Sequence, residues 1–533
     1  MAPLPESVAD WATGARRFDG LGHFHRKVAT DSDEAQQYFD QGMRLLWAFN
    51  HDESTRSFAK AAQLDPKCAL CYWGVALTVG PNYNLPMMAE ARARVAAEAL
   101  ALARKHAGRP EAVEQALIAA LASRYPDARP LNESNVALAL GAYASAMRAV
   151  AARFPDDLDV QTLYAESMMN VNAWKLWTLN GQPAPGTPEI QATLERILRR
   201  DPLHPGANHY YVHLMEASPH PESAVAAAER LSGLMPAAGH LEHMPAHIMQ
   251  RVGRYEDAAQ ANRKGAAADE AYFAQARPLD YYPMIYTAHN YQFLAFSAAM
   301  EGRKAEALDA VRNARRVSAD DQLLQMPAMQ WQLSEEYAAL VRFGLWDEML
   351  ARPAPSPQMG SLTGGYLYAR GIALAAKGRV EEAGKALAEL HSLTDRLSPD
   401  SPAGLNTARD VLELAALLVQ TRIAVAQRRG NDAIALLRDA VAREDRLAYN
   451  EPSDWYFPVR HLLGAQLLEA GQPAAAEAVF REDLKRNPSN GWALFGLAAA
   501  LRQQHRTSDA QQVQQRFAQA WRHSDITLTS AAF

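Results

Sequence analysis

Short turns that interrupt helical patterns constrain the fold of this chain more than any other feature of its sequence. A glycine followed five residues later by an alanine occurs inside such patterns at Gly253, Gly302, Gly378 and Gly471. Apolar residues around these glycines recur at helical spacing, without the alternation that strands require. A glycine allows a tight turn between two helices, and a lone helix pair cannot bury its apolar face. The sequence therefore predicts an all-α stack of helical hairpins.

The repeated segments resemble the tetratricopeptide repeat, a helix–turn–helix unit of about 34 residues. Junctions of the matching kind, in which a proline follows the second helix, occur at Asp65-Pro66 and Asn487-Pro488. The resemblance covers most of the chain in degenerate form, and it implies an all-α superhelical solenoid. The segment GHLEHMPAHI, followed by GRYEDA, is similar to an uncharacterised group of bacterial tetratricopeptide proteins. That likeness implies the fold and no activity.

Two stretches rich in proline and glycine interrupt the repeats, at Asn180–Pro188 and Ala351–Gly365. The second is the better candidate for a domain boundary. We therefore predict an N-terminal array at 1–350, which carries the histidine-rich groove, and a C-terminal array at 363–525. We expect the two arrays to be continuous.

Three further segments depart from the regular repeat, namely Gly80–Met88, Ala165–Pro183 and Tyr449–Pro458. Each contains Asn, Pro and aromatic residues where a repeat would have a short turn. Because a repeat scaffold does not need such departures, we expect these segments to be loops that cap the groove.

The balance of charges limits the partners of the chain. Lys and Arg number 54 and Asp and Glu number 60, so the net charge is −6. This argues against a strongly basic nucleic-acid binder, and we expect no nucleic-acid partner. Polar residues break the longest apolar stretch, Val411–Ala426, so we expect no membrane span and no membrane partner. The start of the chain has no signal-peptide pattern, which predicts a cytoplasmic protein, and such solenoids can form homo-oligomers.

Histidines gather in the middle of the chain. In the repeat register, six of them fall at positions that face the concave groove, in three consecutive units. They are His209, His213, His240, His243, His247 and His289. Residues three, four and seven apart share a helix face, so the spacings support a common groove independently of the register. Since Pro245 would break a helix interior, we expect His240 and His243 on a loop and His247 on the helix that follows.

Neutral imidazole is the commonest protein ligand of zinc, copper, iron and nickel, so the six histidines predict a transition-metal site. Copper or iron is favoured, and zinc is the alternative. Glu216 and Glu166 are the predicted catalytic carboxylates, and together with Glu242 they could also complete the ligand set or orient the imidazoles. Two alternatives need no metal: a pH-sensitive groove for anions, or imidazoles that bond to the backbone and to each other.

The combination predicts a metal-dependent enzyme in the groove, an oxidoreductase that uses copper or iron on a small organic or peptide substrate. A zinc hydrolase is one alternative. A non-catalytic protein-interaction scaffold and a protein that stores or delivers metal are the others. A groove that binds peptide carboxylates would present Lys, Arg and Asn, whereas here the inward positions hold His and Glu.

Two cysteines, Cys68 and Cys71, lie at the start of a predicted helix. The N-terminus of a helix lowers the pKa of a thiol and favours redox or metal chemistry. Alternatively, Cys71 is a small buried residue of the repeat. The sequence leaves open whether the pair is redox-active, binds metal or belongs to the core.

Overall fold

The computed structural model of the chain describes residues 4–86, 88–108, 111–126, 131–132, 134–276 and 281–532. The chain divides into two compact units. The first comprises Met1–Ile248 and Lys264–Tyr282, and the second comprises Met249–Arg263 and Pro283–Phe533.

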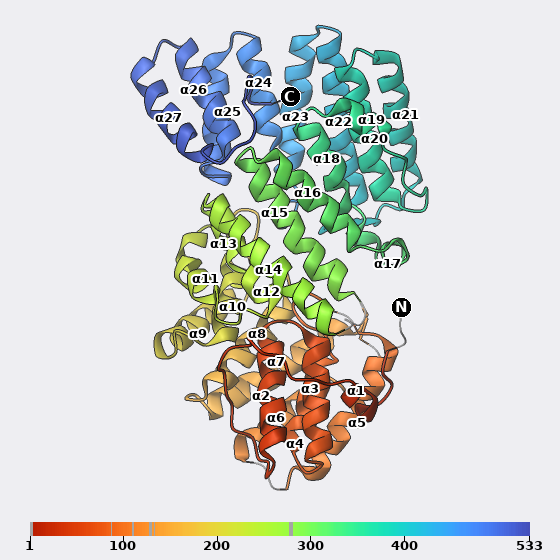
Figure 1. Cartoon of the computed structure of the whole chain (residues 1–533), viewed down its shortest axis with the longest axis vertical. Coiled ribbons are helices and arrows are strands. Elements are labelled where there is room, and N and C mark those ends of the chain that lie inside the picture. Colours follow the sequence, from red (N-terminus) through yellow and green to blue (C-terminus); the bar gives the residue numbers. More distant parts are fainter. Residues whose placement is uncertain are drawn as a thin grey trace. The chain divides into compact units, whose positions relative to one another are not determined.

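Helices build the first unit, which runs from red to yellow in Figure 1. Their bounds are α1 (Val8–Ala12), α2 (Asp33–Trp47), α3 (His51–Leu64), α4 (Ala69–Thr78), α5 (Glu90–His106), α6 (Ala112–Ala122), α7 (Val136–Arg153), α8 (Leu158–Val171), α9 (Thr187–Arg200), α10 (Pro205–Met215), the 3₁₀ turn η1 (Pro221–Ala224), α11 (Val225–Leu231) and α12 (Gly239–His243). Helices α13 (Pro245–Arg251) and α14 (Tyr255–Gln275) contribute residues to both units.

The second unit is also helical. Its elements are the π-helical turn η2 (Pro283–Thr287), α15 (Ala288–Met300), α16 (Lys304–Arg316), α17 (Asp320–Gln325), the 3₁₀ turns η3 (Pro327–Met329) and η4 (Gln332–Ser334), α18 (Glu335–Arg342), α19 (Trp346–Ala351), α20 (Gly360–Ala376), α21 (Val380–Arg396), α22 (Ala408–Ala426), α23 (Gly430–Glu444), α24 (Val459–Glu469), α25 (Pro473–Arg486), α26 (Gly491–Gln503) and α27 (Thr507–Ala520). Strands β1 (Pro402–Ala403) and β2 (Asn406–Thr407) form a small antiparallel sheet in which Pro402 pairs with Thr407.

Consecutive helices pack as hairpins in both units, among them α2 with α3, α20 with α21 and α26 with α27. The predicted all-α, tetratricopeptide-like architecture is therefore confirmed. At the turn between α20 and α21, Gly378 has φ +74°, a conformation that is easy for glycine and costly for other residues. Ala383 on α21 is buried against Leu374 and Ala375 of α20, so the small residue after the turn allows the close approach that the sequence predicts.

Some hairpins reach the same turn without glycine. Arg428, between α22 and α23, has φ +60°, and His505, between α26 and α27, has φ +59°. These residues occupy the position that Gly378 holds in its own hairpin. A search for glycine alone therefore misses hairpins of this kind.

A second small-residue pattern holds three helices together in each unit. The ring of Phe58 on α3 lies against Gly42 of α2 and Gly74 of α4, and neither glycine has room for a Cβ atom. In the second unit the ring of Phe480 on α25 lies in the same way against glycines of α24 and α26, Gly464 and Gly496. Sixteen residues separate each phenylalanine from both of its glycines, so one packing rule repeats in both units.

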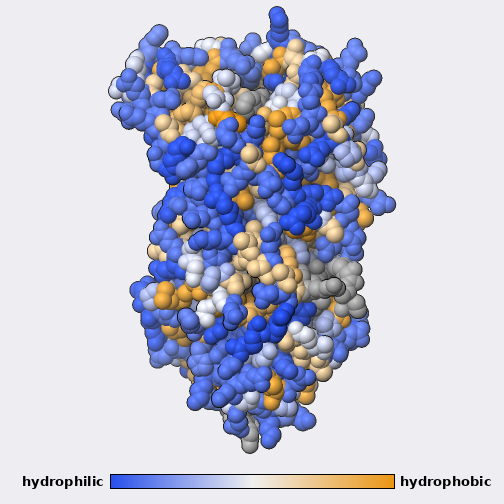
Figure 2. Space-filling model, in the orientation of Figure 1, coloured by the Kyte–Doolittle hydropathy of each residue, from blue (hydrophilic) through white to orange (hydrophobic). Residues whose placement is uncertain are grey.

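The predicted boundary at 351–365 lies inside the second unit, where it runs from the last residue of α19 into the start of α20. The compact units group residues that contact one another, whereas the predicted arrays group consecutive repeats. The units therefore do not test the arrays, and the arrays at 1–350 and 363–525 stay a prediction. Among the described residues, no helix is long and apolar enough to cross a membrane. Figure 2 shows hydrophilic residues over much of the face in view, with smaller hydrophobic areas between them.

Candidate metal centre

Three helical segments of the first unit carry five of the six predicted metal ligands. His209 and His213 lie one turn apart on α10. His240 and His243 lie on α12, and His247 lies on α13. None of the five residues is more than 2% exposed. The segments therefore bury five imidazoles in one unit.

The expectation that His240 and His243 lie on a loop is wrong. Both belong to α12, a helix of five residues that is followed by Met244 and Pro245. Pro245 is the first residue of α13, where the missing N–H costs no hydrogen bond. The proline therefore separates two short helices and does not unwind the first.

His209 is oriented by the end of the first hairpin. Its Nδ1 lies 2.6 Å from the backbone oxygen of Trp47, the last residue of α2. A carbonyl oxygen can only accept a hydrogen bond, so Nδ1 carries the proton. The lone pair of His209 is therefore on Nε2, the atom that faces the other histidines.

Glu216 orients two further rings. This C-cap residue of α10 places one carboxylate oxygen 3.2 Å from Nδ1 of His213 and the other 2.7 Å from Nδ1 of His247. Burial by itself would raise the pKa of Glu216, but the His247 and His213 imidazoles outweigh it and lower this pKa to about 2. The carboxylate is therefore ionised and accepts the proton of each Nδ1. The predicted catalytic role of Glu216 stays a prediction, since the residue lies behind the rings.

Three ring nitrogens converge on the side of the rings that faces away from the Trp47 carbonyl and the Glu216 carboxylate. His209, His213 and His240 each offer one nitrogen, and the three atoms lie within 4.8 Å of one another. The Nε2 atoms of His209 and His240 are 3.1 Å apart. Since the Nε2 of His209 holds a lone pair, either a proton on His240 or a metal ion must stand between the two nitrogens. Two imidazoles on a tetrahedral zinc ion, with bonds of about 2.0–2.1 Å, would hold their nitrogens about 3.3 Å apart.

His213 completes the group. Its Nε2 is buried and has no hydrogen-bond partner within the described part of the chain. An unsatisfied buried acceptor costs free energy, which a bound cation would recover. The His213 ring lies 4.9 Å from the His209 ring, measured between centroids.

The remaining two of these five histidines continue the cluster. The Nε2 atoms of His243 and His247 are 2.9 Å apart, and the His243 ring lies 5.9 Å from that of His240. The sixth predicted ligand, His289, belongs to the second unit, where it lies on α15 and packs edge-on against Phe293.

Burial keeps the converging rings uncharged. It lowers the pKa of His209 and of His240 well below the ordinary value, and the neighbouring imidazoles lower both further. Burial also lowers the pKa of His213, although Glu216 opposes this shift. The neutral form that results at neutral pH is the form that binds metal ions.

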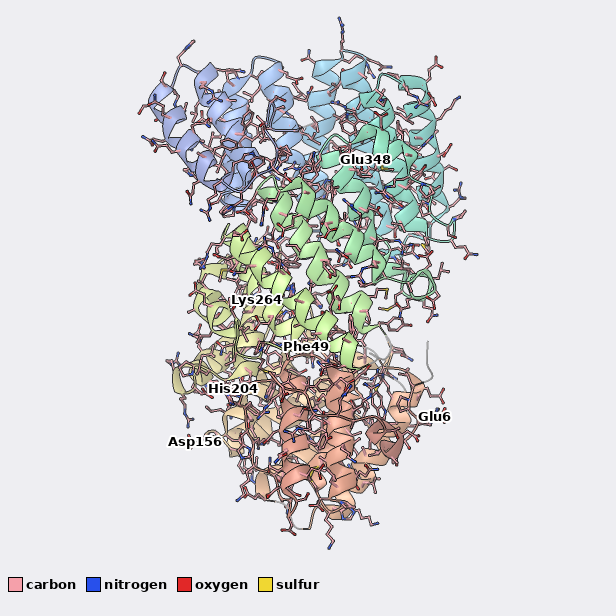
Figure 3. All side chains as sticks on the ribbon, viewed as in Figure 1. Glu6, Phe49, Asp156, His204, Lys264 and Glu348 are labelled. Atoms are coloured by element: carbon pink, nitrogen blue, oxygen red, sulfur yellow. A yellow bond between two sulfur atoms is a disulfide. The ribbon has the colours of Figure 1, made fainter. Side chains whose placement is uncertain are left out.

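Aromatic residues that the histidine pattern did not predict form the wall of the cluster. Phe49, which is labelled in Figure 3, stacks on His213 and on His240. The interplanar angles are 19° and 14°. Phe49 has φ +55°, an uncommon backbone conformation for a large residue. Tyr83, from the predicted loop 80–88, lies 5.2 Å from the His213 ring, so that loop does contribute to the cluster. Met87 of this loop lies outside the described residues.

Glu166, the second predicted catalytic carboxylate, lies elsewhere in the unit. It is on α8 and accepts a hydrogen bond of 2.5 Å from Asn170. Burial raises the pKa of Glu166 to about 6, against the effect of Arg124. Glu166 is not among the described residues whose ligand atoms converge with those of the histidines. Glu242 accepts a hydrogen bond from the backbone N–H of Gly233, and it is not in the described groups of converging ligand atoms either.

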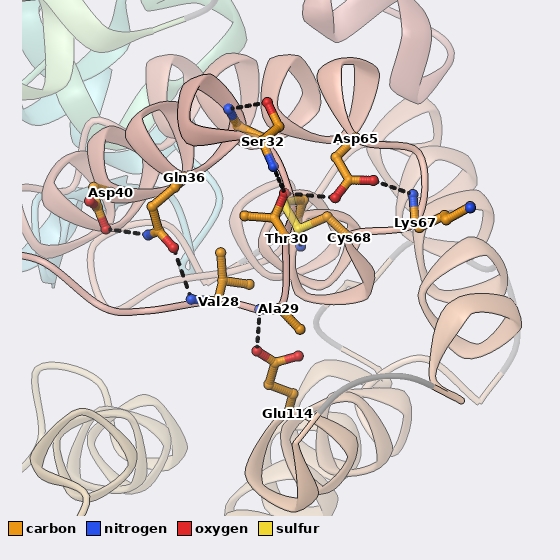
Figure 4. The surroundings of a disulfide bond; sticks show 12 residues. Val28, Ala29, Thr30, Ser32, Gln36, Asp40, Asp65, Lys67, Cys68 and Glu114 are labelled. Carbon is orange, nitrogen blue, oxygen red and sulfur yellow. Dashed lines mark hydrogen bonds between the residues drawn. A yellow bond between two sulfur atoms is a disulfide. The ribbon is translucent and has the colours of Figure 1, made fainter.

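Cys68 and Cys71 form a disulfide at the start of α4 (Figure 4). Both residues are fully buried, and the Sγ atom of Cys68 accepts a hydrogen bond from the N–H of Cys71. The sequence leaves open whether the pair is redox-active, binds metal or belongs to the core. In the bonded state neither sulfur is a thiolate, so the pair offers no thiolate ligand to a metal. Disulfides persist mainly in oxidising compartments. The cytoplasmic location stays a prediction.

Comparison with known proteins supports the repeat architecture. A tetratricopeptide repeat family model matches residues 467–516, which extend from α24 into α27. No curated protein sequence matches the chain significantly. Among solved structures, human IFIT1 with m7Gppp-AAAA is similar over 96% of this chain and 99% of its own, at 10% identity and a TM-score of 0.34. The structure of Naa15/Naa10 bound to HypK-THB covers 91% of this chain and 70% of its own, at 12% identity and a TM-score of 0.22.

The prediction that the chain has no nucleic-acid partner is corrected. A second IFIT1 structure, with PPP-AAAA, is similar to 96% of this chain at 12% identity and a TM-score of 0.33, so two similar structures carry nucleotide ligands. Net charge sums over the whole chain, and a value of −6 does not exclude a local site for a nucleic acid.

The matched segment contains the Gly471 turn and the packing of Phe480 against Gly496, and the same two devices recur in other helices of the chain. Within each unit, many consecutive helices pack as hairpins, such as α2 with α3 in the first and α20 with α21 in the second. Residues 467–516 therefore belong to a tetratricopeptide repeat, and other described helices of the chain pack as hairpins in the same way.

Proposed function

We propose that this protein is a tetratricopeptide repeat scaffold whose first unit binds a transition-metal ion through His209, His213 and His240. The observation that carries the proposal is the set of hydrogen bonds made by the Nδ1 atoms of His209 and His213. Two of the rings use Nδ1 as a donor to Trp47 and Glu216, which leaves both Nε2 lone pairs available at one point. A ring held in this way by a carboxylate or a carbonyl is the usual arrangement of a metal-binding histidine.

The donor set limits which ion would fit. Three neutral imidazoles suit zinc, copper or iron, whereas magnesium and calcium prefer oxygen ligands. The ionised Glu216 would balance part of the positive charge of the ion through the Nδ1 protons of His213 and His247. His243 and His247 lie next to this group and could extend it to a second position.

The burial of the rings favours a closed site. Structural metal sites are closed by protein, whereas catalytic sites keep a position open for water or substrate. Side chains that are at most 2% exposed fit the first kind better. This supports the scaffold and metal-storage alternatives over the copper or iron oxidoreductase and the zinc hydrolase, which would need access to the ion.

Elemental analysis of the full chain, purified without a histidine tag, tests the proposal. After equilibration with Zn²⁺ or Cu²⁺ and removal of excess ion, we expect about one bound equivalent or more, as three-histidine sites give. Replacing a direct ligand, His213→Gln or His240→Gln, should lower affinity by more than the 10–100-fold that is typical of supporting residues.

The matched control is His220→Gln, because His220 lies in the same unit with 70% of its side chain exposed. This variant should bind metal as the unmodified chain does. Circular dichroism confirms that each variant is folded. A folded chain that binds no ion, or equal binding by the His213→Gln and His220→Gln variants, would contradict the proposal and leave a scaffold without metal.

A further inference from the structure

An aromatic pocket in the second unit is separate from the histidine cluster. Five aromatic residues form much of its wall: Trp331, Tyr368, Trp455, Tyr456 and Phe457. Three of them belong to the predicted loop 449–458. The cavity encloses about 60 Å³. At about 30 Å³ for each water molecule, this space admits a small polar head group while the rest of a ligand extends along the walls.

Arg342 is the one charged residue among those that line the pocket. It is 7% exposed, and its guanidinium carbon lies 3.7 Å from the ring centre of Trp492 and 4.9 Å from that of Phe457. Burial lowers the pKa of Arg342 to about 9, so the side chain is still a cation at neutral pH. Its Nε has no hydrogen-bond partner, and no carboxylate of the described residues forms an ion pair with it.

A chain of hydrogen bonds holds the guanidinium in place. Asp483 is ionised, because His461 and two asparagines outweigh the effect of burial and lower its pKa. His461 donates from Nε2 to Asp483 over 2.9 Å, so its Nδ1 is the acceptor for Nη2 of Arg342, 3.0 Å away. Asp483 thus compensates the charge through an imidazole, while the Nε–H of Arg342 remains without an acceptor.

The lining chemistry selects a class of ligand. A guanidinium whose Nε–H lacks an acceptor among the described residues matches a carboxylate, which accepts strong hydrogen bonds from such a group. One cation within apolar walls suits a single negative charge better than a phosphate dianion. We propose that the pocket binds a small organic carboxylate, with the carboxylate at Arg342 and an apolar body along the aromatic wall.

Calorimetric titration of the full chain tests this inference. The probe is phenylacetate, with phenylacetamide as its uncharged analogue and inorganic phosphate as the competing anion. We expect one phenylacetate per chain and at least roughly 10-fold weaker binding of the amide, because hydrogen bonds to a charged group are lost. Binding of phosphate in preference to phenylacetate, or equal binding of acid and amide, would overturn the proposal.

Two variants locate the binding site. Arg342→Gln should abolish binding of phenylacetate. Because this change could also disturb folding, the second variant is Ala338→Leu, which fills the pocket from a lining position of α18 and leaves Arg342 in place. The control is the same substitution at the exposed Ala388 of α21. Binding that persists in folded Ala338→Leu protein, or that is lost equally in Ala388→Leu protein, would refute the assignment. Neither result depends on the metal site of the first unit.

Discussion

Buried histidines have different partners in the two units. In the first, His209 and His213 each donate from Nδ1 and direct Nε2 toward other imidazoles. In the second, His461 is bonded on both sides, to Asp483 through Nε2 and to Arg342 through Nδ1. Burial lowers the pKa of all three histidines. A buried neutral imidazole is therefore not enough to indicate a metal site. The partner of its second nitrogen distinguishes a candidate metal ligand from a histidine that only connects two other side chains.

The largest effect on stability should come from removing His461, which connects Asp483 to Arg342. His461→Ala leaves Asp483 and Arg342 buried without their bridge, which should destabilise the second unit by about 3–5 kcal/mol. Metal content should not change. Hydrogen exchange of peptides from α24 and α25, together with elemental analysis, checks both expectations. Loss of bound metal in this variant would show that the two clusters do not have separate roles.

Removal of metal should affect the other unit. An ion present at 100 times its dissociation constant stabilises its site by about 2.7 kcal/mol, and a chelator removes that contribution. Exchange should accelerate in peptides from α10 and α12 and stay constant in peptides from α24. If chelation leaves α10 and α12 as protected as before, the histidines are bonded to one another without an ion.

Glu216→Gln sharpens the comparison within the first cluster. An amide cannot balance charge as the carboxylate does, and metal affinity should fall by about 10–100-fold, or about 1.4–2.7 kcal/mol. Competition with a chromophoric chelator measures this change. The same substitution at Glu222, whose side chain is 63% exposed, serves as the control and should have no effect. An unchanged affinity in the Glu216→Gln protein would remove this residue from the proposed site.

The smallest effect concerns Glu166, which is buried in the first unit outside the converging histidines. Its folded pKa of about 6 exceeds the ordinary value of 4.5, so protonation contributes stability that is complete below pH 4.5 and is lost as the pH rises through 6. The contribution amounts to about 2 kcal/mol at most. Glu166→Gln should flatten the dependence of the unfolding free energy on pH in this range.

Urea unfolding at several pH values measures that slope, and metal affinity at pH 7 should equal that of the unmodified chain. A large loss of affinity would instead return Glu166 to the metal site, as the sequence analysis expects.

The histidine spacings were informative because they act within a helix. Positions three and four apart lie on one helix face, and this places His240 beside His243 and His209 beside His213 in the structure. The supporting groups carry no comparable signal. Trp47 is 162 residues from His209, and Phe49 looks like an ordinary core residue in the sequence. Glu166 has a repeat position that predicts an inward side chain, and in the structure its carboxylate bonds to Asn170 and its pKa is influenced by Arg124.

Local sequence accounts for the helices, for the hairpin at Gly378 and for the tetratricopeptide repeat at 467–516, since turns and amphipathic periods depend on neighbours within one repeat. It also groups five histidines in one stretch of the chain, although it predicts a loop for His240 and His243, which lie on α12. Folding determines what those histidines can do. Whether the second nitrogen of an imidazole faces other imidazoles or accepts a hydrogen bond from Arg342 depends on which group accepts the proton of the first. Glu216 meets His213 within one helix, whereas Trp47 and Asp483 reach their histidines through the packing of helices.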